Sequence, residues 1–289
     1  MDSSFPEELL QEVLRHAIIR PMDDFSQLPH LRYLTRRVHG HAPGSRRSCI
    51  LVVCRRWYRV ALPLLYTRVR LAEPEHTKAV ARVVQHRPEL GGAIRHLRLD
   101  GGHGKELYAL LKLAPNVESL YLSLDATSKD SVAGFRRAVK EGVLRARVLY
   151  YTDASSGSER NKVLTELLAI AQTHIAQSKS LTHVILNSHE KIRPSLAEAL
   201  QKSPSLTDVT LYADTILETL KTGLFQKIAT NPSVRIVHCR GQRDKARIEK
   251  HIAEHGVAER VLNLIAFEHD EDEVTLREMW AEEEHCHFN

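Results

Sequence analysis

A short apolar pattern recurs along this chain and restricts its fold more than any other feature of the sequence. The pattern has apolar residues at its first, fourth and sixth positions. Its copies begin at intervals of 28, 23, 64, 25, 28 and 28 residues. The starting residues are Tyr66, Ile94, Val117, Leu181, Leu206, Val234 and Leu262. Periods of this length indicate supersecondary units that bury their apolar faces by stacking on one another.

The segments between these copies predict helices, so each repeat is expected to hold a strand followed by a helix. Apolar residues recur at helical spacing in residues 78–85, 107–113, 163–176 and 216–228. The interval of 64 residues has room for one more unit. Residues 147–151 lie inside it and are rich in types that favour strands.

Alternate side chains of a strand point to opposite faces, so the residues between the apolar anchors define the second face of the predicted sheet. This face would carry His96, Arg98, Asp100, Ser119, Tyr121, Ser123, His183, Ile185, Asn187, Asp208, Thr210, Tyr212, Ile236, His238 and Arg240. Mixed polarity with tyrosine and arginine suits protein recognition, because these types anchor many interfaces. A solvated sheet face is the alternative interpretation.

A first helix is predicted near the start of the chain. Pro6 suits a first helical turn, Glu7 and Glu8 favour the helix dipole, and Pro21 ends the helix. The apolar residues form two adjacent rows, Leu9, Val13 and Ala17 in one and Leu10, Leu14 and Ile18 in the other. The apolar face is therefore unusually wide.

A second helix is predicted from about Ser48 to Pro63, after an insertion at residues 20–48 that is partly loop. Its apolar stripe comprises Ile50, Val53, Cys54, Trp57, Tyr58 and Ala61. Because Cys54 belongs to this stripe, we expect its thiol to be buried.

The formal net charge of +5 conceals a separation between the two ends of the chain. Residues 25–72 hold ten arginines and no acid, and residues 268–284 hold nine acids and one base. A basic start indicates either nucleic acid or an acidic protein as a partner, and charge alone does not separate the two.

The two predicted helices together resemble the F-box. That family opens with an apolar residue, proline, any residue, glutamate and two leucines, as in Phe5-Pro6-Glu7-Glu8-Leu9-Leu10. Its second half has valine, cysteine, two basic residues and tryptophan, as in Val53-Cys54-Arg55-Arg56-Trp57. Compact F-boxes join these halves by a few residues, whereas about thirty intervene here. A longer connection costs little, because closure entropy grows only logarithmically with length.

The strand and helix repeats are similar to the irregular leucine-rich repeats often found behind an F-box. The resemblance implies an α/β fold with an F-box-like helical domain at residues 1–65 and its insertion at about 20–48. Residues 66–289 would form a leucine-rich-repeat-like solenoid of alternating parallel strands and helices, with an acidic C-terminal segment.

This resemblance implies a substrate-recognition adaptor of a Skp–cullin–F-box type ubiquitin ligase, which holds a Skp-type adaptor, and through it a cullin, together with an unknown target protein. The residues expected to dock the adaptor are Phe5, Pro6, Leu9, Leu10, Val13, Val53, Cys54 and Trp57. The candidates for binding the target are Arg98, Tyr121, His183, Tyr212, His238 and Arg240.

Two other functions stay open. The F-box-like helices could merely cap the solenoid of an interaction scaffold outside ubiquitination, since solenoids need their terminal cores covered. Nucleic-acid binding is the weaker alternative, because Arg55, Arg56 and Arg59 lie in the F-box-like piece, where steering toward an acidic adaptor explains the same charges.

The chain lacks the motifs of common enzymes and metal sites. Gly-x-Ser-x-Gly, His-Glu-x-x-His and Cys-x-x-Cys do not occur, so we expect neither catalysis nor a cofactor. His285-Cys286-His287 has no second ligand pair, so no structural metal is expected. Gly101-Gly102-His103-Gly104 lacks nucleotide-binding spacing and is interpreted as a repeat turn.

Cysteine usage and hydropathy indicate where the chain resides. Four scattered cysteines and the absence of a signal-peptide pattern predict a reducing, cytoplasmic or nuclear location. No apolar run approaches the roughly 20 residues that cross a bilayer, so no membrane association is expected.

Overall fold

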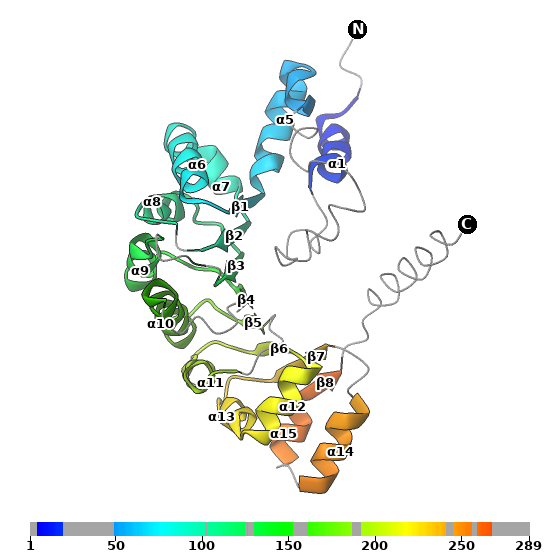
Figure 1. The fold of residues 1–289 in the computed structure, drawn as a ribbon. Coiled ribbons are helices and arrows are strands. Elements are labelled where there is room, and N and C mark those ends of the chain that lie inside the picture. The colour runs from blue at the N-terminus through cyan, green and yellow to red at the C-terminus, as the bar shows by residue number, and fades with distance from the viewer. Residues whose placement is uncertain are drawn as a thin grey trace, which may run out of the picture. The chain divides into compact units, whose positions relative to one another are not determined.

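The computed structural model divides the chain into two compact units, Met1–Leu181 and Thr182–Asn289. It describes residues 5–19, 49–101, 103–124, 126, 130–152, 161–186, 192–240, 245–255 and 259–267. Both units are α/β, with parallel strands that alternate with helices and follow one another in the sheet in chain order (Figure 1).

The first unit opens with two helices, α1 (Glu7–Ile18) and α5 (Arg55–Tyr66). A short 3-10 turn, η1 (Cys49–Val52), precedes α5 and packs on it. Pro6 occupies the N-cap position of α1 and its carbonyl accepts the hydrogen bond of the Leu10 amide, so the helix begins where the sequence predicts. The expected insertion at 20–48 lies outside the described residues.

The two apolar rows of α1 have different environments. Leu10, Leu14 and Ile18 are 4%, 1% and 3% exposed and form one cluster with Val60, Ala61 and Leu64 of α5. Leu9 and Val13 of the neighbouring row are 53% and 55% exposed. The wide apolar face therefore divides into a row that holds α1 against α5 and a row that does not.

Polar contacts also join the start of α1 to α5. The Arg59 guanidinium forms an ion pair with Glu7, and Arg56 donates a hydrogen bond to the carbonyl of Phe5. These two arginines contribute to the pairing of the helices while Arg59 remains 69% exposed.

Three expectations for the second helix are wrong. It begins at Arg55 rather than near Ser48, because Cys49–Val52 form a 3-10 turn and Cys54 is extended. Pro63 does not end it: α5 continues to Tyr66 with Pro63 inside, where the missing N–H costs the helix one hydrogen bond. Cys54 is exposed rather than buried, because it is the extended N-cap residue of α5 and stands before the helical stripe begins.

Four strands and five helices of the first unit follow. The strands are β1 (Arg68–Leu71), β2 (His96–Asp100), β3 (Ser119–Ser123) and β4 (Val148–Thr152). The helices are α6 (Pro74–His86), α7 (Pro88–Ala93), α8 (Glu106–Leu113), α9 (Ala133–Lys140) and α10 (Lys162–Gln177). These helices line one face of the sheet, as Figure 1 shows.

The register of these strands confirms the predicted anchors. Leu97 pairs with Val69 and Leu120, which places equivalent apolar side chains side by side across the sheet. The interval of 64 residues contains the extra strand, β4, whose anchors are Ala146, Leu149 and Tyr151, all at most 3% exposed.

The second unit repeats the scheme with β5 (His183–Leu186), β6 (Asp208–Tyr212), β7 (Ile236–Arg240) and β8 (Ile265–Phe267). Its helices are α11 (Pro194–Lys202), α12 (Ala213–Lys221), α13 (Leu224–Ala229), α14 (Lys245–His255) and α15 (Glu259–Leu264). Buried Asn231 links neighbouring repeats: its amide donates to the carbonyls of Leu200 and Ser203, each at 2.8 Å.

Two details of this unit differ from the sequence prediction. The helix expected over 216–228 is two helices, because Gly223 adopts a φ of 70° and breaks it. Leu262 is not an apolar anchor: it lies in α15 and is 37% exposed, whereas Val261 and Leu264 are the buried residues there.

Candidate functional site

The sheet of the first unit has a face opposite its helices, formed by the side chains between the anchors. Its strands are in register across all four positions of β1, so Arg68 lies beside His96 and Arg70 beside Arg98. Arg98 in turn lies beside Tyr121, which lies beside Tyr150. We call this set of side chains, with Asp100, the arginine–tyrosine face.

An ion triad occupies the centre of the arginine–tyrosine face. The two carboxylate oxygens of Asp100 accept from different guanidiniums, Oδ2 from Arg70 Nε at 2.6 Å and Oδ1 from Arg98 Nε at 2.8 Å. The Arg98 and Asp100 side chains are only 3% and 7% exposed, whereas Arg70 is 30% exposed. Burial lowers the pKa of Arg98, and Asp100 opposes that shift. The triad fixes Arg98 in place and leaves Arg70 within reach of solvent.

Next to the triad, Tyr121 and Tyr150 stack with their ring centroids 3.9 Å apart and their planes 10° from parallel. Tyr121 is buried, and Tyr150 is partly exposed. Burial, followed by the hydrogen bond with Tyr150, raises the pKa of Tyr121, so its hydroxyl stays protonated. The pair presents a neutral aromatic surface beside the arginines.

Arg68 and His96 lie at the edge of the same face. Arg68 Nε and Nη1 and His96 Nδ1 are buried atoms that make no hydrogen bond in the described part of the chain. Burial, followed by the charge of Arg68, lowers the pKa of His96, so its imidazole is neutral near pH 7.

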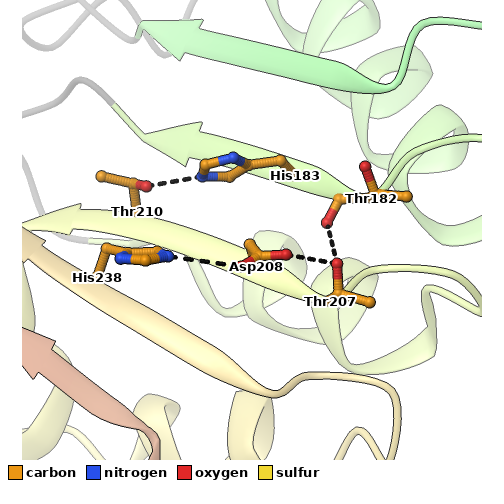
Figure 2. A network of polar contacts seen from close by, with 6 residues as sticks. All are labelled: Thr182, His183, Thr207, Asp208, Thr210 and His238. Atoms are coloured by element: carbon orange, nitrogen blue, oxygen red, sulfur yellow. Dashed lines mark hydrogen bonds and ion pairs between the residues drawn. The ribbon is translucent and has the colours of Figure 1, made fainter.

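The corresponding face of the second unit carries a different network (Figure 2). His183 Nε2 and Thr210 Oγ1 share a hydrogen bond of 2.8 Å, and His238 Nε2 lies 3.4 Å from Asp208 Oδ1. Thr207 Oγ1 contacts Asp208 and, at 3.0 Å, the carbonyl of Thr182. The two imidazole centroids are 5.9 Å apart.

The two histidines of this network have different partners. Thr210 contacts His183, whereas Asp208 contacts His238 (Figure 2). The arrangement offers hydrogen-bond donors and acceptors to a ligand.

The residues expected to dock an adaptor fall into two groups. Phe5, Leu9, Val13 and Val53 are 47% to 56% exposed, and Pro6 and Cys54 are exposed as well. Leu10 is buried in the contact between α1 and α5, and Trp57 packs against the same cluster while half-buried. The structure therefore separates side chains that hold the helices together from side chains that remain accessible.

The residues expected to bind a target are also divided. His183 and His238 are partly exposed on the second unit, whereas Arg98 and Tyr121 are at most 4% exposed. Tyr212 and Arg240 belong to strands, but their side chains lie outside what the structure describes. Arg98 and Tyr121 serve as supports for neighbours that are more accessible.

The sequence interpretation missed several residues of these surfaces: Val52, Arg68, Arg70, Tyr150 and Thr207. Arg68 and Arg70 alternate with the anchors Val69 and Leu71, so the same period of two could have included them. No signal marks Val52, which is 82% exposed in the turn before α5.

The glycine turn after β2 is closed by residues of the following repeat. The Gly104 amide donates to the carbonyl of Ser131 at 2.8 Å, and the Gly104 carbonyl accepts from the Gly134 amide. A side-chain carbon at Gly134 would stand 2.2 Å from that carbonyl oxygen. The turn therefore packs against the start of α9.

A separate hollow of about 470 Å³ lies where α9 and α10 end, lined by Lys140, Arg145, His174 and Lys179 among others. His174 is 4% exposed, and its Nε2 makes no hydrogen bond to the described residues. Burial lowers the pKa of His174 to about 4.

Other kinds of site are not found in the described ranges. No group of three or more histidine, cysteine, aspartate or glutamate side chains there could hold a metal ion. The cluster His285-Cys286-His287 lies outside those ranges. No helix among the described residues combines the length and the hydropathy needed to cross a membrane.

Comparison with known proteins identifies no relative. No model of a protein family matches the chain, and no curated protein is significantly similar to it.

Proposed function

We propose that this chain is the substrate-recognition adaptor of a Skp–cullin–F-box type ubiquitin ligase. In this proposal α1, η1 and α5 act as an F-box that docks a Skp-type adaptor, and through it a cullin. The strand and helix repeats act as a leucine-rich-repeat-like array that holds a target protein. Catalysis belongs to other subunits.

The observation that carries the proposal is the exposed apolar row of α1. Leu9 and Val13 are four residues apart, so they lie on one side of the helix, and Phe5 precedes the N-cap residue Pro6. Each is about half exposed, whereas the adjacent row is buried against α5. Contiguous exposed apolar side chains on a soluble chain indicate an interaction surface.

The segment before α5 adds to this apolar surface. Val52 and Val53 are 82% and 56% exposed, and both precede the first turn of the helix. Val53 belongs to the motif that resembles the F-box. The structure thus leaves apolar side chains accessible in both halves of that motif.

The alternative is a scaffold in which these helices only cap the repeats. α5 does pack against α7 and β1. In the described part of the chain, however, the exposed row of α1 packs on neither α5 nor a repeat, and a cap does not require such a row. This row therefore favours docking over capping.

Co-expression with a Skp-type adaptor tests the proposal. Changing Pro6→Ala together with Leu9→Ala should abolish co-purification of the adaptor and leave the repeats folded. Val83→Ala is the matched control, because Val83 is an exposed apolar residue on α6, away from the docking row. Adaptor recovered equally with both variants, or a wild-type chain that is monodisperse and captures none, would support the cap instead.

A further inference from the structure

The arginine–tyrosine face carries more positive than negative charge. Three guanidiniums, those of Arg68, Arg70 and Arg98, share one carboxylate, that of Asp100. Both oxygens of Asp100 accept hydrogen bonds from Arg70 and Arg98, and Arg68 forms no ion pair with a carboxylate among the described residues. Positive charge that is partly removed from water is unfavourable unless an anion compensates it.

The uncompensated charge coincides with unfulfilled hydrogen bonds. Arg68 Nε and Nη1 are buried atoms without a partner in the described part of the chain, and so is Nδ1 of neighbouring His96. Buried polar atoms in native proteins are nearly always hydrogen-bonded, so an unpaired group of donors calls for an external acceptor. A carboxylate suits this position, because a guanidinium presents two parallel N–H groups to it.

Accessibility separates the residues that would touch a ligand from those that support them. Arg68, Arg70, His96 and Tyr150 are all partly exposed. Arg98 is buried beneath them and is held by Asp100. The stacked tyrosines add a rigid aromatic surface next to the charge, a combination that is common at the centre of protein interfaces.

The second unit does not offer the same chemistry. Its acid, Asp208, lies beside His238 and Thr207, and the described side chains of that face include no arginine. Among the described side chains of the two sheet faces, arginines are therefore present on the first unit alone.

We infer that the arginine–tyrosine face binds an acidic segment of the target protein, with Arg68 and Arg70 pairing with aspartate or glutamate carboxylates. His96 and Tyr150 flank the bound segment. Arg98 and Asp100 are positioning residues that hold Arg70 in place. The inference rests on the proposed function insofar as it takes the repeats to be the part that holds a target.

A labelled acidic peptide tests this inference directly. Fluorescence anisotropy of fluorescein-labelled hexaglutamate is titrated with the full chain in the absence of adaptor. Arg68→Gln should weaken binding at least about threefold, and Arg68→Gln with Arg70→Gln about tenfold, because each removes a charge-assisted pair. The single variant is the cleaner one, since Arg68 Nε and Nη1 make no hydrogen bond to the described residues that the substitution would break.

A charge-matched control separates a specific site from general attraction. Arg82→Gln with Arg145→Gln removes the same charge from exposed positions away from this face and should change the affinity less than twofold. Equal weakening in both double variants, unchanged binding in Arg68→Gln, or no binding of hexaglutamate by the wild type at low salt would overturn the inference.

Three further probes define the class of partner: a neutral peptide, a phosphorylated peptide and an oligonucleotide. A hexaserine peptide should not bind, and a phosphoserine peptide should bind no more tightly than hexaglutamate. Tighter, Arg68-dependent binding of a single-stranded oligonucleotide would contradict the inference and identify a nucleic-acid surface. Arg68→Gln should retain co-purification of the Skp-type adaptor, so loss of either activity alone shows which of the two proposals fails.

Discussion

The N-terminal pair of helices and the repeats use the same apolar residue types in opposite ways. In the repeats, anchors such as Leu97, Leu120 and Val209 are fully buried. In the helical pair, Phe5, Leu9 and Val13 remain about half exposed. The repeats bury their anchors within the chain itself, whereas the helical pair leaves an apolar surface that no other described residue covers.

Neighbouring strands explain this difference. Each central repeat lies between two others, so the anchors of β3 contact those of β2 and β4 in register. α1 packs on α5, and its second apolar row finds no such neighbour in the described chain. Substitutions in the two regions should therefore change the free energy of unfolding by different amounts.

The largest effect is expected in the core of the repeats. Leu120→Ala should lower the free energy of unfolding by about 3 kcal/mol, because Leu120 is fully buried and a cavity would remain. Urea denaturation measures it. A loss below about 1 kcal/mol would show that the repeat core is not as closely packed as the structure indicates.

A smaller, pH-dependent effect is expected at buried His174 in the repeats. Its pKa of about 4 lies below that of the unfolded chain, so the folded state resists protonation and stability falls as pH drops from about 6.5 to about 4. The contribution amounts to about 2 kcal/mol at pH 5.

Replacing the imidazole of His174 isolates its contribution to the pH dependence of stability. In His174→Gln the loss of stability between pH 7 and pH 5 should be smaller than in the wild type by about that amount. Parallel curves of denaturation midpoint against pH for the two chains would show that His174 is not buried in its neutral form.

The smallest effect is expected on the exposed row of α1. Leu9→Ala with Val13→Ala should change the free energy of unfolding by less than about 0.5 kcal/mol, because both side chains already contact water. Leu14→Ala, in the buried row of the same helix, is the matched comparison and should be strongly destabilising. Similar losses in both would abolish the distinction between the rows.

Much of the repeat architecture could be predicted from residue spacing, since anchors such as Leu97 and Leu99 must alternate with solvent-facing residues in a strand. β4 was harder, because Ala146 and Tyr151 are atypical anchors. The helix α7 was missed because it spans only six residues, too few for a periodic signal.

The sequence predicts which side chains point to the face opposite the helices, but not how deeply each of them is buried. Alternation along β2 and β3 correctly directs Arg98 and Tyr121 to the face opposite the helices. Side chains on adjacent strands then bury both, which depends on register and stacking that a single segment does not encode. The sequence also does not distinguish the buried row of α1 from the exposed row, because both rows have helical spacing.

Hydrogen exchange of the full chain, with and without a purified Skp-type adaptor, tests the central claim most directly. The account predicts that the adaptor protects backbone amides in residues 5–18 and 52–58 and leaves those of β1 to β4 unchanged. Protection confined to the strands, or an adaptor that alters no amide in the N-terminal helices, would contradict it.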